Sequence, residues 1–364
     1  MAEPKTIAGY ARALRPRLGT GVFAPAHSRL WWIPLHGAVV TLGTVVLTRH
    51  LVSWPIALLL SLAIGFSFAG LTFLGHETLH GAVIRNRSLR YLVGFLGFLP
   101  FVVSPRLWIA WHNGVHHGNT NRAGADPDAY PTLEEYRTDR AVRIATDCAA
   151  PGLGRLRGMA SLLIGFSVQS AHMLVVARKR GYLLPAEHRR AIAETLLGIV
   201  LWVSLARVLG AIPFVFAFLL PLVVANAVVM GFILTNHSLS PLTSSNDPLA
   251  NSLTVTTPRW LEWLTLGFGF HVEHHLFPAM SARHAPKVRE LLLTDFRDRY
   301  QSLSLLRATY FLHARGRVYK DDLTLVDPKS GREWPALAPG GCGSPVPRPA
   351  LDEPERMHLQ DRNA

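Results

Sequence analysis

Histidines gather at three places in this chain. Of 17 histidines, eight fall into three short clusters that are separated by long stretches without such a pattern. Residues three or four apart share one face of a helix, so each cluster predicts imidazoles that point together. The clusters are His76-Glu77-Thr78-Leu79-His80, His112-Asn113-Gly114-Val115-His116-His117 and His271-Val272-Glu273-His274-His275.

Eight imidazoles are more than one metal ion can use. A four-coordinate zinc site takes four ligands at most, whereas two octahedral ions could use most of the eight. Imidazole suits iron, and open positions on non-haem iron are where dioxygen is activated. The clusters therefore predict a pair of iron ions that react with O2. A ninth candidate ligand is His237, and the adjacent Asn236 is a candidate partner for a ligand or a bound water.

Regular helical geometry makes a finer prediction about how these rings are oriented. His112 and His116 should face one way, and so should the three histidines of the last cluster. His117 would be rotated away from His116, so it reaches a second metal or requires the helix to end there.

The first cluster also allows a different reading. His76–His80 matches H-E-x-x-H, the zinc metallopeptidase motif, in which Glu77 would be the general base. A membrane zinc peptidase needs one further ligand and leaves the other two clusters without a role. It also predicts zinc rather than iron, so metal analysis separates the two hypotheses.

Apolar segments must position the clusters. The mean hydropathy of +0.22 and the charged fraction of 17% favour a membrane protein. Four apolar runs are about long enough to cross a ~30 Å hydrocarbon layer as helices. They form two hairpins: Leu30–Leu47 with Trp54–Leu74, and Ala193–Leu209 with Ile212–Leu234.

Shorter apolar runs are expected to lie in the interface or to re-enter the membrane. Tyr91–Val103 and Leu261–Phe270 are too short to cross. Ser161–Val176 is marginal in length and is interrupted by Gln169, Ser170 and His172, of which His172 is expected to be an ordinary residue.

Counting spans predicts the topology. If only the four long runs cross, and Ser161–Val176 lies in the interface, all three clusters face the side of the N-terminus. Lys and Arg in the loops make that side cytoplasmic. The predicted fold is thus an all-α integral membrane protein with four transmembrane helices in two hairpins, interfacial helices, and a cytoplasmic helical cap that carries the histidines.

Charge and cysteine content exclude other classes. The net charge of +13 comes from basic residues that flank apolar segments rather than form one stripe, so nucleic acid is not an expected partner. Cys148 and Cys342 stand alone and predict neither a disulfide framework nor a cysteine zinc site. Residues 1–20 lack an apolar core, so a cleaved signal peptide is not expected.

The predicted organisation has three parts. Residues 1–29 form a basic cytoplasmic segment, and residues 30–307 form the membrane domain with the three clusters. Residues 308–364 form a polar C-terminal segment, which is expected to be disordered beyond 338 because Pro, Gly and charged residues dominate there.

The three clusters, in this order, resemble the histidine boxes of the membrane fatty acid desaturase and hydroxylase superfamily. The stretch from His271 to Pro278 is similar to the third box of acyl-lipid desaturases, and the separation of His80 from His112 is also typical. The resemblance covers roughly residues 30 to 300.

The resemblance implies a di-iron centre that uses O2 and two electrons to remove two hydrogens from an alkyl chain held in an apolar tunnel. Glu77 and Glu273 would orient neighbouring imidazoles. No His-Pro-Gly-Gly haem element is present, which implies a separate electron donor of the ferredoxin or cytochrome b5 type. Related enzymes are hydroxylases or ketolases that act on carotenoids, sphingolipids or alkanes, so desaturation of an acyl lipid is one of several outcomes. The implied ligands are His76, His80, His112, His116, His117, His237, His271, His274 and His275.

Overall fold

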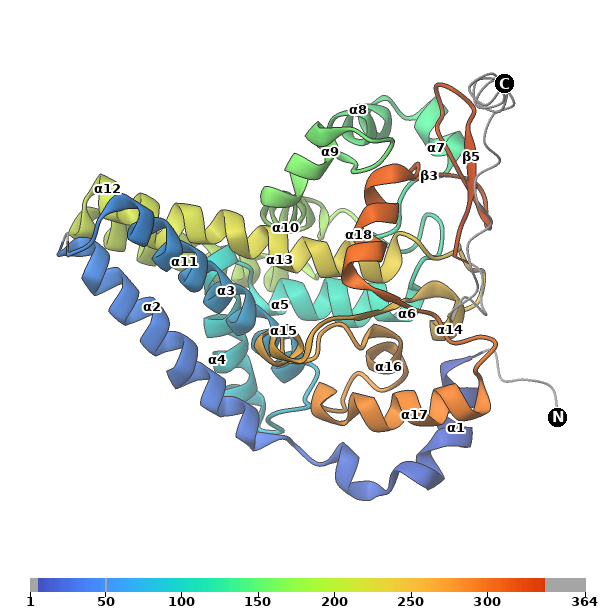
Figure 1. Cartoon of the computed structure of the whole chain (residues 1–364), viewed down its shortest axis with the longest axis horizontal. Helices are drawn as coiled ribbons and strands as arrows, with labels where there is room; N and C mark the ends of the chain where they lie inside the picture. Colours follow the sequence, from blue (N-terminus) through green and yellow to red (C-terminus); the bar gives the residue numbers. More distant parts are fainter. Residues whose placement is uncertain (1–5, 50, 338–364) are drawn as a thin grey trace, which may run out of the picture.

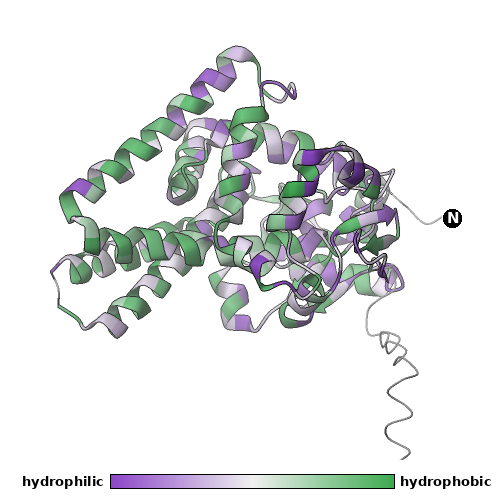
Figure 2. Cartoon of the chain, turned by 90° about the horizontal axis from the view of Figure 1, so that it is seen from above, coloured by the Kyte–Doolittle hydropathy of each residue, from purple (hydrophilic) through white to green (hydrophobic). Residues whose placement is uncertain are grey.

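Helices dominate the computed structural model, which describes residues 6–49 and 51–337 (Figure 1). Long helices lie together at one end, and short helices with small sheets form a cap at the other. Apolar residues prevail in the long helices and polar residues gather in the cap (Figure 2). The prediction of a helical membrane protein is therefore confirmed.

The described residues contain four helices that are long and apolar enough to cross a membrane. They correspond to the four predicted runs. The second and fourth continue past the apolar run by roughly one turn, and this turn carries His76 and His237. The spans are His27–Thr48 with α2 (Trp32–Thr48), α3 (Trp54–Leu79), α11 (Pro185–Leu209), and Ala211–His237 with α12 (Ala211–Phe214), a π-helical turn (Val215–Leu219) and α13 (Leu220–His237).

Two bent helix pairs lie beside the spans. The first bends by 99° between Arg87–Phe101 and Pro105–Asn119, and the second by 69° between Leu156–Leu163 and Gly165–Val176. No single arm is long enough to span, although length and composition also allow each pair to be one broken span. Their helices are α4 (Arg87–Phe98), α5 (Pro105–Trp108), a π-helix (Ile109–His116), α6 (His117–Asn119), α9 (Leu156–Ala160) and α10 (Gly165–Val176).

The cap is built from short helices and small sheets. In β1–β2, the parallel pairing places Val255 opposite Leu303. The antiparallel sheet has the order β3-β4-β5. The helices are α1 (Ile7–Leu18), α7 (Leu133–Thr138), α8 (Arg140–Ala149), α14 (Pro248–Asn251), α15 (Arg259–Leu264), α16 (His271–Leu276), α17 (Ala285–Asp295) and α18 (Leu305–Ala314). The strands are β1 (Thr254–Thr256), β2 (Ser302–Ser304), β3 (Val318–Asp321), β4 (Thr324–Val326) and β5 (Glu333–Pro335).

Both ends of the chain help to hold the cap. From the basic N-terminal segment, Tyr10 and Leu14 of α1 pack with Val272 of α16 in a small core. At the other end, the predicted boundary before residue 308 falls inside α18, whose Ala308 and Leu312 are buried in the main core. The predicted disorder beyond 338 concerns residues outside the described part.

Close packing of α3 on α4 sets the position of the first cluster. A Cβ at Gly97 would lie 2.6 Å from the Leu71 carbonyl oxygen and 2.8 Å from the Gly75 Cα. Gly75 immediately precedes His76, so the two backbones meet directly below the histidines.

Gly97→Ala is therefore expected to lower the free energy of unfolding by about 1–3 kcal/mol, because overpacking at backbone cannot be relieved by a rotamer change. Thermal unfolding of the detergent-solubilised protein measures this. The control is Gly37→Ala in α2, where a Cβ meets nothing within 4 Å; equal melting of both variants and the wild type would contradict the packing argument.

Candidate metal centre

The first cluster ends the second span. His76 lies in the last turn of α3 and His80 follows as its C-cap residue, with ring centroids 4.8 Å apart. The Nε2 atom of His80 is buried and has no hydrogen-bond partner among the described residues. A buried nitrogen of this kind is costly unless a ligand occupies its lone pair.

The second cluster lies on the π-helix Ile109–His116, and this sets its ring orientations. The wider turn of a π-helix brings residues five apart together. His117 Nε2 accordingly lies 3.2 Å from His112 Nε2, and His76 Nε2 lies 3.1 Å from the same atom. The prediction that His117 is rotated away from His116 agrees with these contacts, and the π-helix turns its ring toward His112.

The third cluster divides between two directions. His271 Nε2 lies 2.6 Å from His237 Nε2 and 3.2 Å from His275 Nε2. His274 instead faces the first cluster, with ring centroids 4.7 Å from those of His76 and of His80. The expectation that all three rings face one side was therefore wrong: residues three apart on α16 point far enough apart to reach different groups.

The histidines converge into two groups, to which α13 contributes His237. In each group the candidate ligand atoms lie within 4.8 Å of one another. His117 lies between the groups, 4.7 Å from His80 and 4.3 Å from His275 by ring centroids. The groups are His76, His80, His112 and His274, and His116, His237 and His275; a third candidate set, His112, His116 and Asp128, joins the two.

Neutral imidazoles suit metal binding, because only a deprotonated nitrogen can bind a metal. Burial, reinforced by neighbouring imidazoles, lowers the pKa of His271 and of His275 well below the ordinary value. Burial lowers the pKa of His274 to about 3. His116 differs from the others: burial alone would lower its pKa, but Asp126 and Asp128 raise the pKa to about 9. Several pairs of Nε2 atoms face each other within 3.2 Å, and a proton on one nitrogen can satisfy only one neighbour. The remaining Nε2 lone pairs are therefore available to bind cations. The chemistry of the donor set thus fits two metal ions.

Carboxylates behind His116 were missed by the sequence analysis. The His116 Nδ1 lies 3.0 Å from Asp126 Oδ1 and 3.4 Å from Asp128 Oδ2. Backbone N–H groups of Asn121 and Asp128 donate to Asp126 at 2.8 and 3.0 Å. Burial alone would raise the pKa of Asp126, but His116 and these donors lower it. The sequence feature that could have indicated these partners is the pair of aspartates at 126 and 128, shortly after the second cluster.

The other predicted partners of the ligands lie close by, but they bind other groups. Glu273 accepts hydrogen bonds from Thr254 Oγ1 at 2.6 Å and from the Tyr300 hydroxyl at 2.5 Å. Glu77 accepts from the Ala282 N–H at 2.9 Å and lies 3.6 Å from Arg29. Both carboxylates thus fix the helices that carry histidines.

Asn236 is buried, and within the described chain its side-chain amide has no hydrogen-bond partner. It precedes His237, so an amide with free donors and an acceptor lies next to one of the two histidine groups. The predicted role of Asn236, as a partner for a ligand or a bound water, stays a prediction.

A narrow cavity of about 40 Å³ lies beside the histidines, between α3, α13 and the bent helix pairs. We call it the slot. Aromatic rings surround it, and the rings of Trp108 and Phe268 have centroids 5.2 and 5.0 Å from that of His76. Its lining includes Phe73, Phe98, Trp108, Trp111, Phe166 and Phe268 beside His76, His112, His116, His237 and His271. Apart from Thr72, Asp128 and Gln169 on its lining, the non-histidine wall is apolar and suits an alkyl segment.

The fold and the site together define a class of membrane protein. Its histidine-rich centre lies at the ends of the membrane spans, and the donor set of this centre fits metal ions. Comparison with known families refines this class. The model of the fatty acid desaturase family matches residues 52–306. The chain belongs to this family, so it is related to enzymes of lipid oxidation rather than to zinc peptidases.

Curated relatives are similar to parts of the chain. An omega-6 fatty acid desaturase of the chloroplast of Spinacia oleracea is 24% identical over 59% of this chain and 48% of its own. An sn-1 acyl-lipid omega-3 desaturase (ferredoxin) of Synechocystis is 30% identical over 26% of each chain. A beta-carotene 4-ketolase of Protosiphon botryoides is 34% identical over 21% of this chain and 20% of its own. The matched region spans half or less of each relative.

Proposed function

We propose that this protein is an O2-dependent oxidoreductase that introduces a double bond into the acyl chain of a lipid. The observation that carries the proposal is the convergence of nine imidazoles from five elements, α3, the π-helix, α6, α13 and α16, beside a narrow aromatic slot. Family membership supports lipid oxidation, and the desaturase relatives favour an acyl chain over other alkyl substrates.

Two iron ions are the proposed cofactors, because imidazole-rich sites with open positions suit non-haem iron. His76, His80, His112 and His274 would hold one ion, and His116, His237 and His275 the other, with His117 and His271 completing the set. Iron bound there would supply the one-electron oxidising chemistry with O2. Overall, the acyl chain of the substrate loses two hydrogen atoms. These two hydrogens, together with two electrons from the donor and two protons, reduce O2 to two waters.

The protein's own part is positioning. The slot would hold one segment of the alkyl chain against the histidines and keep water out, which limits side reactions. Asp126 would hold the His116 ring in place through Nδ1, leaving Nε2 for the metal.

The electron donor is proposed to be a separate protein of the ferredoxin or cytochrome b5 type. One relative is named for ferredoxin. Exposed arginines near the first cluster and on α1, such as Arg12, Arg15, Arg85 and Arg87, favour a cytoplasmic orientation of this face and attraction of an acidic donor.

Expression in a host of simple lipid composition, followed by mass spectrometry of its lipids, tests the proposal. The expected result is a new unsaturated acyl chain, absent from cells that carry His116→Ala. A lipid product that has gained an oxygen atom instead would show that the enzyme is a hydroxylase or ketolase. The similarity to a beta-carotene 4-ketolase is the reason to test for this outcome. Purified protein with zinc and no iron would refute the di-iron proposal.

The variant Glu77→Gln distinguishes the di-iron oxidoreductase hypothesis from the zinc peptidase hypothesis. The Gln side-chain oxygen can still accept from the Ala282 N–H, so we expect turnover to fall less than about tenfold, the size of a modest positioning effect. Near-total loss of activity in this variant, with iron content unchanged, would contradict the structural part assigned to Glu77.

A further inference from the structure

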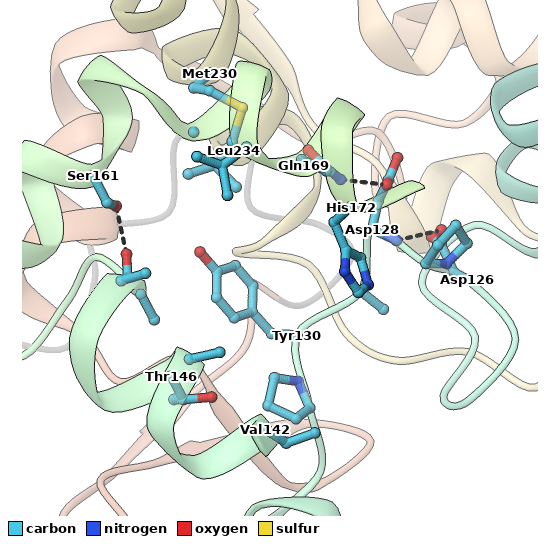
Figure 3. A pocket seen from close by; sticks show the side chains of 18 of the residues that line it. Asp126, Asp128, Tyr130, Val142, Thr146, Ser161, Gln169, His172, Met230 and Leu234 are labelled. Carbon is cyan, nitrogen blue, oxygen red and sulfur yellow. Dashed lines mark hydrogen bonds between the residues drawn. The ribbon is translucent and has the colours of Figure 1, made fainter. Parts of the chain in front are cut away.

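A second, larger cavity lies next to the slot. It has a volume of about 890 Å³ and is lined by the loop from Gly124 to Pro131, by α8, by α10 and by the end of α13 (Figure 3). The proposed function gives this space no role. We call it the vestibule.

The vestibule and the slot share a wall made by Asp128 and Gln169. Gln169 Nε2 donates to Asp128 Oδ1 at 2.7 Å, and Trp111 Nε1 donates to the same oxygen at 3.1 Å. Gln169 is thus one of the polar residues that interrupt the otherwise apolar α10. A molecule that occupies both cavities must pass this wall.

Unused hydrogen-bonding groups face the vestibule. Figure 3 shows the Tyr130 hydroxyl projecting into the cavity, with Thr146 and His172 also on its lining. Within the described residues the side chains of these three make no hydrogen bond to protein. Burial raises the pKa of Tyr130 to about 12, although Arg317 opposes the shift, so its hydroxyl is a neutral donor.

The charges around the vestibule disfavour an anion. Asp126, Asp128 and Glu135 line it, against a single arginine, Arg180. Phosphate sites in proteins depend on clustered Arg or Lys or on helix N-termini. Among the described residues, the vestibule lining offers no such cluster, and its carboxylates already bind His116 or Thr132. An uncharged group with hydroxyls needs no such cluster.

The remaining lining is apolar. Met230 and Leu234 of α13 lie opposite Tyr130 (Figure 3). Val168 of α10 also lines the cavity. One side can therefore cover hydrocarbon while the other binds hydroxyls, as the junction between the polar and apolar parts of a lipid requires.

We propose that the vestibule binds an uncharged end of the lipid substrate that carries several hydroxyls, as a sugar does, while its alkyl chain passes Gln169 into the slot. The inference rests on the proposed function, whose substrate it narrows to lipids with neutral polar ends.

A binding experiment tests this without turnover. The purified full-length protein in detergent is mixed with equal amounts of four lipids that carry the same acyl chains, and retained lipid is quantified by mass spectrometry. The lipids are monogalactosyldiacylglycerol, diacylglycerol, phosphatidylglycerol and phosphatidylcholine. We expect the galactolipid to be retained about tenfold over each of the others, the effect of two or three net hydrogen bonds.

Variants locate the binding. Tyr130→Phe and Thr146→Val each remove a hydroxyl at nearly constant volume, and each should reduce the preference by about threefold. Tyr310→Phe, on the exposed face of α18, is the matched control and should keep the preference.

Equal retention of diacylglycerol and galactolipid would overturn the inference, as would a preference for either phospholipid or unchanged ratios in both cavity variants. The outcome is separable from the proposed function. A protein that desaturates acyl chains but shows no head-group preference refutes only the vestibule assignment. One that retains galactolipid but oxidises no lipid refutes only the proposed function.

Discussion

Replacing His76, His116 or His274 with Ala is expected to abolish lipid oxidation while leaving the protein in the membrane. His76 and His274 belong to one histidine group and His116 to the other. Loss of a direct ligand should exceed the tenfold to hundredfold effects of its outer partners, so we expect turnover to fall by more than about a hundredfold. Iron per chain, measured on purified protein, should fall in parallel.

The matched control is His27→Ala, since this histidine is exposed and lies outside both groups. It should keep the iron content and turnover of the wild type. Membrane fractionation and melting curves check that each variant folds. Full turnover in all three ligand variants would refute the metal assignment, and loss of iron in His27→Ala would show that the measurement reports general destabilisation.

The spans and the convergence of the clusters could be predicted because each depends on local composition. A run such as Trp54–Leu74 can bury its backbone only as a helix when it lies in lipid. The number of spans then returns each cluster to one face, and the short distances from His274 to the first cluster agree with that prediction.

The division of ligands between two groups could not be predicted, because it depends on backbone geometry that spacing does not encode. The π-helix brings His117 to His112, where a regular helix would separate them. On α16, the tertiary packing of α1 and α17 sets the rotation that sends His274 and His275 to different groups.

Side chains that support the ligands were equally hard to identify. Glu77 and Glu273 lie inside the clusters, yet they bind backbone and hydroxyl groups. The carboxylates that contact a ring, Asp126 and Asp128, come from a loop ten and twelve residues beyond His116. Short strands such as β3 and β4 were not predicted, because the mixed polar sequence of residues 308–337 carries no long apolar period.

Asp126→Asn is expected to weaken iron binding by about tenfold to a hundredfold, the usual effect of removing an outer carboxylate from a metal-bound histidine. The amide keeps the shape of the carboxylate, but it lacks the charge that holds the His116 Nδ1–H toward it. The Asn121 and Asp128 N–H donors would also face a weaker acceptor or a flipped amide. Competition with an iron chelator gives the dissociation rate and the affinity.

Added iron distinguishes this positioning role from simple misfolding. If Asp126 acts through His116, excess iron should restore part of the turnover, because the ligand nitrogens themselves remain. A misfolded variant would not recover. Asp322→Asn, on an exposed loop, is the matched control and should bind iron as the wild type does. Iron affinity and release unchanged in Asp126→Asn would show that this carboxylate does not orient His116, and the ring would then have to be held by Asp128 and the π-helix.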